Sequence, residues 1–212
     1  YVDDVHGYDF ANGDGDPMDD NQHGTHVAGT IGAVANNGVG IAGINWNVQI
    51  MALKFLGAKG DGSISDAIEA VDYAVANGAT LSNNSWGFSG GFSQALFDAI
   101  QSAQDSDHVF LAAAGNGNFL GIGQDNDATA FWPSSFELDN IISVAALDHD
   151  NQRAMFSNFG QTSVDIGAPG VSILSTTPSN GYESFSGTSM ATPHVAGVVA
   201  MVRDLNPTWS YS

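Results

Sequence analysis

Apolar and polar positions follow two different periods along the chain, and the two periods predict strands and helices in turn. Segments of strand length are predicted at 7–10, 48–56, 79–84, 109–114, 141–146 and 164–166, and those at 48–56, 109–114 and 141–146 are mostly apolar. Between them, apolar residues recur every three or four positions, as on one face of a helix. These predicted helices cover 23–35, 65–77, 93–104 and 189–205.

Strands that alternate with helices predict an α/β fold, with a doubly wound parallel sheet and helices on both faces. The length of 212 residues suits one domain with a sizeable core, and we find no repeat or linker. In such sheets functional groups gather where the strands end. Ser85-Trp86-Gly87 and Gly115-Asn116 each follow a predicted strand, and we therefore expect a site at that edge.

Composition narrows the possible partners. Hydrophobic residues make up 43% of the chain, which is typical of a globular protein. The 23 acidic residues stand against 4 basic ones and give a formal charge of −19. This excess of negative charge argues against nucleic-acid binding and against docking on anionic membranes. No apolar run reaches membrane-spanning length, and the absence of cysteine excludes disulfides and thiolate metal sites.

Two segments carry candidate chemistry. His23 opens His-Gly-Thr-His-Val-Ala-Gly, and Ser189 lies in Gly-Thr-Ser-Met-Ala-Thr-Pro-His-Val-Ala-Gly. A serine becomes a good nucleophile when an imidazole takes its proton, and an imidazole titrates near neutral pH. Pro193 is expected in the first helical turn, where a missing N–H costs nothing.

Simpler interpretations remain open for both residues. Serine is a favoured helix cap, so Ser189 alone could have only that role. His23 could cap or pack, and His26 is expected to be packed. A zinc site built on His23 and His26 is disfavoured, because the chain has no cysteine and no carboxylate in a zincin arrangement.

Together with Ala112-Ala113-Ala114-Gly115-Asn116, these segments resemble the subtilisin-like serine proteases, the subtilases (peptidase family S8), over nearly the whole chain. The resemblance implies a secreted, monomeric serine endopeptidase that acts on proteins or peptides and is made with a pro-segment. Ser189 would be the nucleophile, His23 the general base and Asn116 the donor to the oxyanion. From the residues alone, Asn116 could equally be a turn residue after Gly115.

The resemblance also implies a substrate cleft. Its two walls would be formed by Ser85, Trp86 and Gly87 and by Ala113, Ala114 and Gly115. Its edge, which would pair with an extended peptide, would be formed by Gly60, Asp61 and Gly62. Phe131 is expected near the pocket floor, where a bulky residue favours small substrate side chains, although it could equally belong to the core. The Trp132–Pro133 bond is expected to be cis.

Two loops are candidate calcium sites. The acidic loop at 9–18 offers the carboxylates of Asp9, Asp14 and Asp16, and Ca²⁺ prefers oxygen ligands in flexible loops. The loop at 36–41 resembles a second calcium loop of the family, with oxygens from Asn37, Val39 and Ile41. Both loops could instead be ordinary solvated turns.

One expected residue is not visible. The third catalytic residue of the family is an aspartate in an Asp-Ser/Thr-Gly motif that follows an apolar strand. Asp3, Asp4 and Asp9 precede His23, but none follows such a strand. We therefore expect residues 1–212 to be a partial peptidase domain that lacks the first strand, with its aspartate, and the C-terminal end.

Two other function classes compete with the peptidase. The first is a non-catalytic, calcium-stabilised binding domain. The second is a serine esterase, which is disfavoured because no Gly-x-Ser-x-Gly motif surrounds Ser189. An apolar strand ending in Asp-Ser/Thr-Gly upstream of residue 1 would favour the peptidase.

Overall fold

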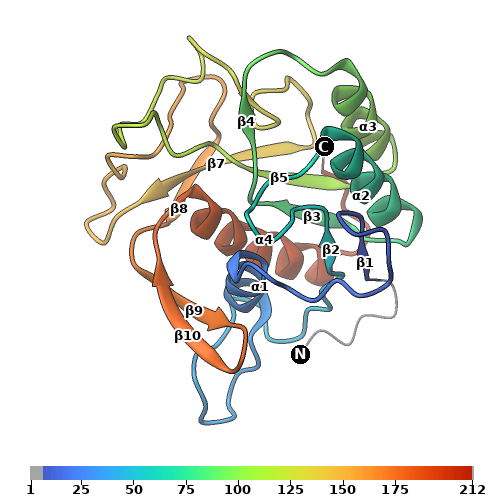
Figure 1. The fold of residues 1–212 in the computed structure, drawn as a ribbon, viewed down its shortest axis with the longest axis vertical. Helices are drawn as coiled ribbons and strands as arrows, with labels where there is room; N and C mark the ends of the chain where they lie inside the picture. The colour runs from blue at the N-terminus through green and yellow to red at the C-terminus, as the bar shows by residue number, and fades with distance from the viewer. Residues whose placement is uncertain (1–6, 212) are drawn as a thin grey trace.

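A sheet of four parallel strands forms the centre of the molecule. The computed structural model describes residues 7–211. Within them the strands lie side by side in the order β3-β5-β7-β8, as Figure 1 shows. Their bounds are β3 Leu81–Asn84, β5 Val109–Ala113, β7 Ile141–Leu147 and β8 Ile166–Pro169. The expected parallel α/β fold is confirmed.

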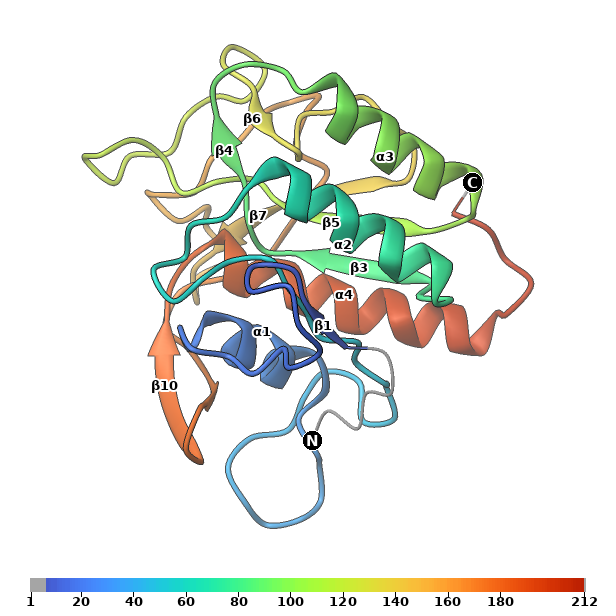
Figure 2. The same ribbon diagram turned by 45° about the vertical axis from the view of Figure 1, so that its right-hand side comes forward.

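Helices cover both faces of this sheet (Figure 2). One face carries α2 (Ile64–Ala76) and α3 (Gln94–Asp105), which pack against each other. The other face carries α1 (His23–Gly32) and α4 (Thr188–Leu205), and α4 contacts every strand of the sheet. None of the helices within residues 7–211 is both long and apolar enough to cross a membrane.

The alternating side chains of β5 explain why helices cover both faces. Phe110 and Ala112 belong to the core cluster that includes residues of α2 and α3. Val109 and Leu111 belong to the cluster on the opposite side, with residues of α1 and α4. Successive side chains of a strand point to opposite faces, so a run that is apolar at every position requires cover on both sides.

Some elements were not predicted. An antiparallel hairpin of β9 (Ile173–Thr177) and β10 (Gly181–Phe185) packs on α1. A second pair joins β4 (Phe88–Ser89) to β6 (Phe131–Trp132). The expected cis bond between Trp132 and Pro133 is present next to β6.

A separate pair of short strands holds the segment before α1. The predicted strand at 48–56 is a strand at β2 (Leu53–Lys54), which pairs in parallel with β1 (Tyr8–Asp9). The Lys54 Nζ lies 2.7 Å from the Asp9 carboxylate in a buried ion pair. Burial would raise the pKa of Asp9, but hydrogen bonds from Lys54 and Asn12 outweigh it and hold that pKa below its ordinary value. Asp9 is therefore ionised and fully engaged at neutral pH.

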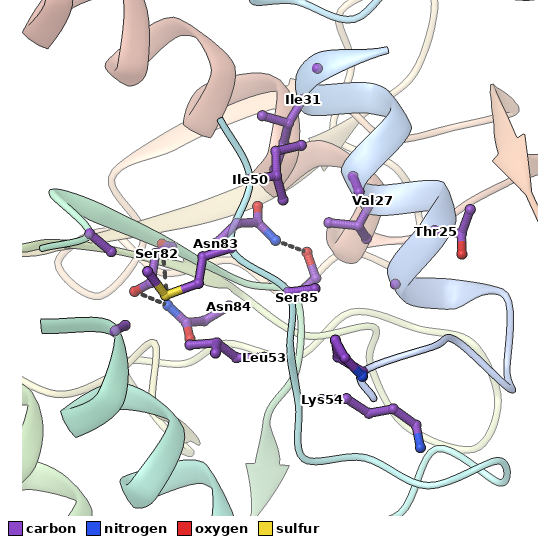
Figure 3. Close-up of a pocket in the computed structure, with 18 of the residues that line it drawn as sticks. Thr25, Val27, Ile31, Ile50, Leu53, Lys54, Ser82, Asn83, Asn84 and Ser85 are labelled. Atoms are coloured by element: carbon purple, nitrogen blue, oxygen red, sulfur yellow. Dashed lines mark hydrogen bonds between the residues drawn. The ribbon is translucent and has the colours of Figure 1, made fainter. Parts of the chain in front are cut away.

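A deep groove separates β2 from β3. Among the described strands, β3 pairs with β5 on one edge and with none on its other edge. The space beside that free edge has a volume of about 2620 Å³. Figure 3 shows Val27 and Ile31 of α1, Ile50, Leu53 and the β3 side chains around it. The buried amide oxygen of Asn83 on this edge has no hydrogen-bond partner among the described residues.

Candidate active site

Ser189 lies in the first turn of α4 and is tied to the end of β3. Its hydroxyl donates a hydrogen bond of 3.0 Å to the carbonyl oxygen of Ser85. In return, the Ser85 hydroxyl donates a hydrogen bond of 2.8 Å to the carbonyl oxygen of Ser189. This reciprocal pair joins the helix start to the carboxyl edge of the sheet.

Pro193 explains why the Ser189 carbonyl is open to Ser85. The helix begins at Thr188, so Pro193 lies in its second turn, and the expectation of a first-turn proline was wrong. In a regular helix the N–H of residue 193 would donate to the carbonyl of residue 189. Proline has no N–H, and the hydroxyl of Ser85 satisfies that carbonyl instead. Pro193 thus leaves the Ser189 carbonyl free to accept a hydrogen bond from Ser85, which follows β3.

Asn116 is oriented by the same helix start. Its side-chain oxygen accepts hydrogen bonds from the backbone N–H of Thr188 at 2.8 Å and from the Thr188 hydroxyl at 3.0 Å. A backbone N–H can only donate, so this contact fixes which end of the amide is oxygen. The NH₂ end of Asn116 therefore remains available as a donor, as an oxyanion site requires.

Two buried asparagines hold the loop that carries Asn116, and sequence reasoning missed both. Asn158 accepts hydrogen bonds from the backbone N–H groups of Gly117 and Gln124. The Asn158 amide donates to Asn126, whose own amide donates to the carbonyl of Ala114. No motif in the sequence pointed to them, because their partners lie far away along the chain.

His23 is the first residue of α1 and borders the groove. Within residues 7–211, no hydrogen-bond partner contacts its ring. Burial lowers its pKa below the ordinary value; the charge of Asp19 opposes that shift, and His26 adds to it. The ring is therefore mainly neutral at pH 7, as a general base must be.

Asp19 secures the start of α1 and was also missed. The N-cap residue Gln22 makes no side-chain capping bond. Asp19 instead accepts hydrogen bonds from the Thr25 backbone at 2.7 Å and the Thr25 hydroxyl at 2.6 Å. An ionised carboxylate at a helix N-terminus is favourable, and this one also lies close enough to affect the charge of His23.

The two helix starts lie on the same side of the molecule (Figure 2), and α1 packs directly against α4. In this structure the hydroxyl of Ser189 is directed to Ser85 rather than to His23. His26 is packed, as expected: it is fully buried, stacks on Phe185 at 4.4 Å and bonds through Nε2 to backbone carbonyls.

The residues expected to form the cleft walls lie on neighbouring strand ends. Asn84 pairs with Ala112 across β3 and β5, so the segments 85–87 and 113–115 leave the sheet side by side. Gly60, Asp61 and Gly62 lie in an exposed turn after β2, where Gly62 bridges to Leu56. Their proposed pairing with a peptide stays a prediction.

The three carboxylates of the acidic loop accept separate hydrogen bonds in this structure. Both oxygens of Asp9 are engaged, one by the Asn12 backbone and the other by Lys54 and the Asn12 amide. Asp14 and Asp16 each accept a backbone N–H two residues on. Among the described residues, no three acidic, histidine or cysteine side chains converge as metal ligands. The role of Asp9 as a calcium ligand stays a prediction.

The second candidate calcium loop, at 36–41, contains one hydrogen bond between a side chain and the backbone. The side-chain oxygen of Asn37 accepts the N–H of Val39 at 3.0 Å, and both residues are exposed. The roles of Asn37, Val39 and Ile41, like those of Asp14 and Asp16, stay predictions.

Comparisons with known proteins agree on one family. The sequence profile of the subtilase family matches residues 1–212. The chain is 44% identical over 204 residues to "Alkaline elastase YaB" of Bacillus sp. (strain YaB), covering 96% of this chain and 50% of that protein. It is 42% identical over 204 residues to "Subtilisin Savinase" of Lederbergia lenta, covering 96% of this chain and 71% of that protein.

A solved structure extends the likeness to the fold. The crystal structure of a cold adapted subtilisin-like serine proteinase superposes with a TM-score of 0.84 at 39% identity, covering 98% of this chain and 70% of the other. A "Thermophilic serine proteinase" of Bacillus sp. (strain AK1) is 44% identical over 93% of this chain and 46% of its own length. The chain thus spans about half the length of the first curated relatives it matches.

Replacing Asp19 should lower the pKa of His23 further. Asp19→Asn removes the negative charge that favours the protonated ring but keeps an oxygen acceptor for Thr25. Proton NMR titration of the His23 ring in residues 1–212 measures the shift. Asp20→Asn is the matched control, because Asp20 pairs with Lys54 and not with His23. A His23 pKa that is unchanged or raised in Asp19→Asn would contradict this electrostatic account.

Proposed function

Because the chain belongs to the subtilase family, we propose that it is the larger part of a serine endopeptidase domain that hydrolyses peptide bonds in proteins or peptides. One observation carries this proposal beyond family membership. The start of α4 presents Ser189 beside a donor, the Asn116 amide, whose oxygen end is held by Thr188. A nucleophile next to an oriented amide donor is the arrangement that acyl transfer needs.

The chemistry follows from these groups. The Ser189 Oγ attacks the peptide carbonyl carbon while His23 takes the hydroxyl proton, and a tetrahedral oxyanion forms. The Asn116 NH₂ and the Ser189 N–H donate to that oxyanion; the latter is free because it lies in the first turn of α4. His23 then returns the proton to the leaving amine, and water releases the acyl group from Ser189.

For this cycle the Ser189 hydroxyl must leave Ser85 and turn to His23. Rotation about one side-chain bond suffices to move a serine hydroxyl between acceptors. The bond that remains, from the Ser85 hydroxyl to the Ser189 carbonyl, holds the backbone in place during this movement. Ser85 is therefore proposed as a positioning residue.

A carboxylate is still needed to orient His23 and to stabilise its charged form. We propose that it arrives on a β-strand of the full-length protein that fills the groove between β2 and β3. Three features support this: the unpaired edge of β3, the unpartnered Asn83 oxygen, and the border of the groove at His23. Asp9 is not that group, because Lys54 and Asn12 engage it, and Asp3 and Asp4 lie outside the described residues.

The alternative is a non-catalytic binding domain of the same fold. It is favoured by the Ser189–Ser85 bond, which leaves serine and histidine unpaired. A binding domain, however, needs neither the Thr188–Asn116 contact nor an exposed donor beside Ser189. Secretion, a pro-segment and a monomeric state are further proposals that rest on family membership.

Replacing either Ser189 or His23 should nearly abolish activity, and the two losses should not be additive in the double variant. In the full-length protein, Ser189→Ala and His23→Ala should each reduce kcat on a peptide substrate by the order of 10⁶, the magnitude known for the corresponding residues of subtilisin itself. The double variant should be little worse, because nucleophile and base act as one unit.

Steady-state and single-turnover hydrolysis measure these losses. His194→Ala is a useful control, since His194 bonds to the Met190 carbonyl on its own helix and has no place in the mechanism. Losses from Ser189→Ala and His23→Ala that multiply in the double variant would show separate roles and refute the mechanism.

Calcium should stabilise the full-length protein if either candidate loop binds it. A ligand that binds only the native state adds about 2.7 kcal/mol at a hundredfold excess over its Kd. Thermal unfolding with calcium and with chelator measures the effect. Asn37→Ala tests the loop at 36–41, and Asp14→Asn tests the acidic loop. Equal melting temperatures with calcium and chelator would rule out both loops.

A further inference from the structure

The turn that carries Asn116 has little rigidity of its own. Asn116 lies between Gly115 and Gly117, whose φ angles are +107° and +78°. Glycine adopts such positive φ angles without strain, but it also moves easily between conformations. A donor to an oxyanion, in contrast, must stay within about 0.5 Å of its productive position. The Asn116 turn must therefore be held by contacts from other segments.

Asn158 supplies these contacts on both sides of Asn116. Its backbone N–H donates a hydrogen bond of 2.9 Å to the Gly115 carbonyl. Its side-chain oxygen accepts a hydrogen bond of 2.9 Å from the Gly117 N–H. A Cβ atom added to Gly115 would lie 2.5 Å from the Asn158 amide nitrogen, so the amide packs directly against that backbone. One residue thus fixes both glycines.

The Asn158 amide is itself fixed in the interior. Asn158 and Asn126 are each 4% exposed. The Asn158 amide donates to the Asn126 side-chain oxygen at 2.9 Å, and the Asn126 amide donates to the Ala114 carbonyl at 2.9 Å. The Asn126 N–H also donates to the Phe159 carbonyl at 2.7 Å. The network returns to the chain one residue before Gly115, so hydrogen bonds hold the turn on both sides.

Asp127 anchors the segment that follows Asn158. One oxygen of the Asp127 carboxylate accepts the Ser163 N–H at 2.9 Å and the Ser163 hydroxyl at 2.7 Å, and the other accepts the Gln161 N–H at 2.7 Å. The bond from the Ser163 hydroxyl holds the pKa of Asp127 at about 2, below its ordinary value. The carboxylate is therefore ionised at neutral pH, and it joins the segments 124–127 and 158–163.

We propose that Asn158 is a positioning residue for the oxyanion donor Asn116. The inference rests on the proposed function and deepens it. Thr188 holds the oxygen end of the Asn116 side chain, whereas Asn158 holds the backbone of the turn. Without Asn158 the two glycines can rotate, and the Asn116 NH₂ moves away from the place where the oxyanion forms. Because the negative charge develops only as the tetrahedral oxyanion forms, the loss falls on kcat and not on KM.

Kinetics of the full-length protein on a peptide substrate test this role. Asn158→Ala should lower kcat by about tenfold or more with KM unchanged, since a displacement of about 1 Å can cost about a hundredfold. Asn116→Ala should lower kcat by about 10²–10³, the loss known for such a donor in subtilisin itself. In the Asn116→Ala background, Asn158→Ala should cost less than about twofold, because no donor remains to be positioned.

Asn140→Ala is the matched control. Asn140 is 1% exposed, and its amide donates to the carbonyls of Ile100 and His108. It precedes β7, whereas Asn116 follows β5, so the two asparagines lie at opposite ends of these parallel strands. Asn140→Ala should lower the melting temperature, as the loss of any buried amide does, but leave kcat of the folded enzyme unchanged.

Asn126→Ala is a second variant and decides the matter if Asn158→Ala does not fold. It leaves Asn158 in place but removes the acceptor of its amide. This variant should lower kcat by a smaller factor than Asn158→Ala, again with KM unchanged, and the loss should disappear in the Asn116→Ala background.

The outcomes separate the two proposals. If kcat is unchanged in the folded Asn158 and Asn126 variants, or falls equally with and without Asn116, the positioning role is overturned and the peptidase stays intact. A rise in KM alone, or an equal loss of kcat in Asn140→Ala, also overturns that role. A full-length parent that hydrolyses no peptide overturns the proposed function and the inference with it.

Discussion

The attachment of the first turn of α4 to the end of β3 is the constraint on which the candidate site depends. Two hydrogen bonds cross between Ser85 and Ser189, and one of them exists because Pro193 leaves the Ser189 carbonyl without its helical partner. The hydrogen bond that α4 lacks at Pro193 is thereby replaced by one between α4 and the segment that follows β3. It places a hydroxyl at the edge of a rigid sheet, where its position depends on the core and not on a loop.

The same turn organises the second half of the site. Thr188 precedes Ser189 and holds the oxygen of Asn116 with both its N–H and its hydroxyl. Asn126 and Asn158 fasten the loop around Asn116 from the other side. His23 is different, because it borders a groove and no described residue bonds to its ring. The start of α4 and Asn116 are therefore preorganised, whereas the His23 ring has no hydrogen-bond partner among the described residues.

Sequence reasoning recovered the parts that depend on local pattern. The strands that became β3, β5 and β7, the helices α1 to α4, and the strand-end positions of Ser85 and Asn116 all follow from periodicity and turn residues. The β9–β10 hairpin was missed although Asn180-Gly181 is a turn signal. Asp19, Thr188 and Asn158 were missed because their roles depend on contacts with other segments. The pairing of Asp9 with Lys54 was missed because Lys54 lies far along the chain.

The central claim is that Ser189 is an activated nucleophile, and covalent labelling tests it most directly. The full-length protein would be treated with a serine-directed phosphonofluoridate and digested, and the adduct would be mapped by mass spectrometry. The account predicts a single adduct on Ser189, formed much more slowly in His23→Ala. An adduct on another serine, or no adduct in a folded protein, would contradict it.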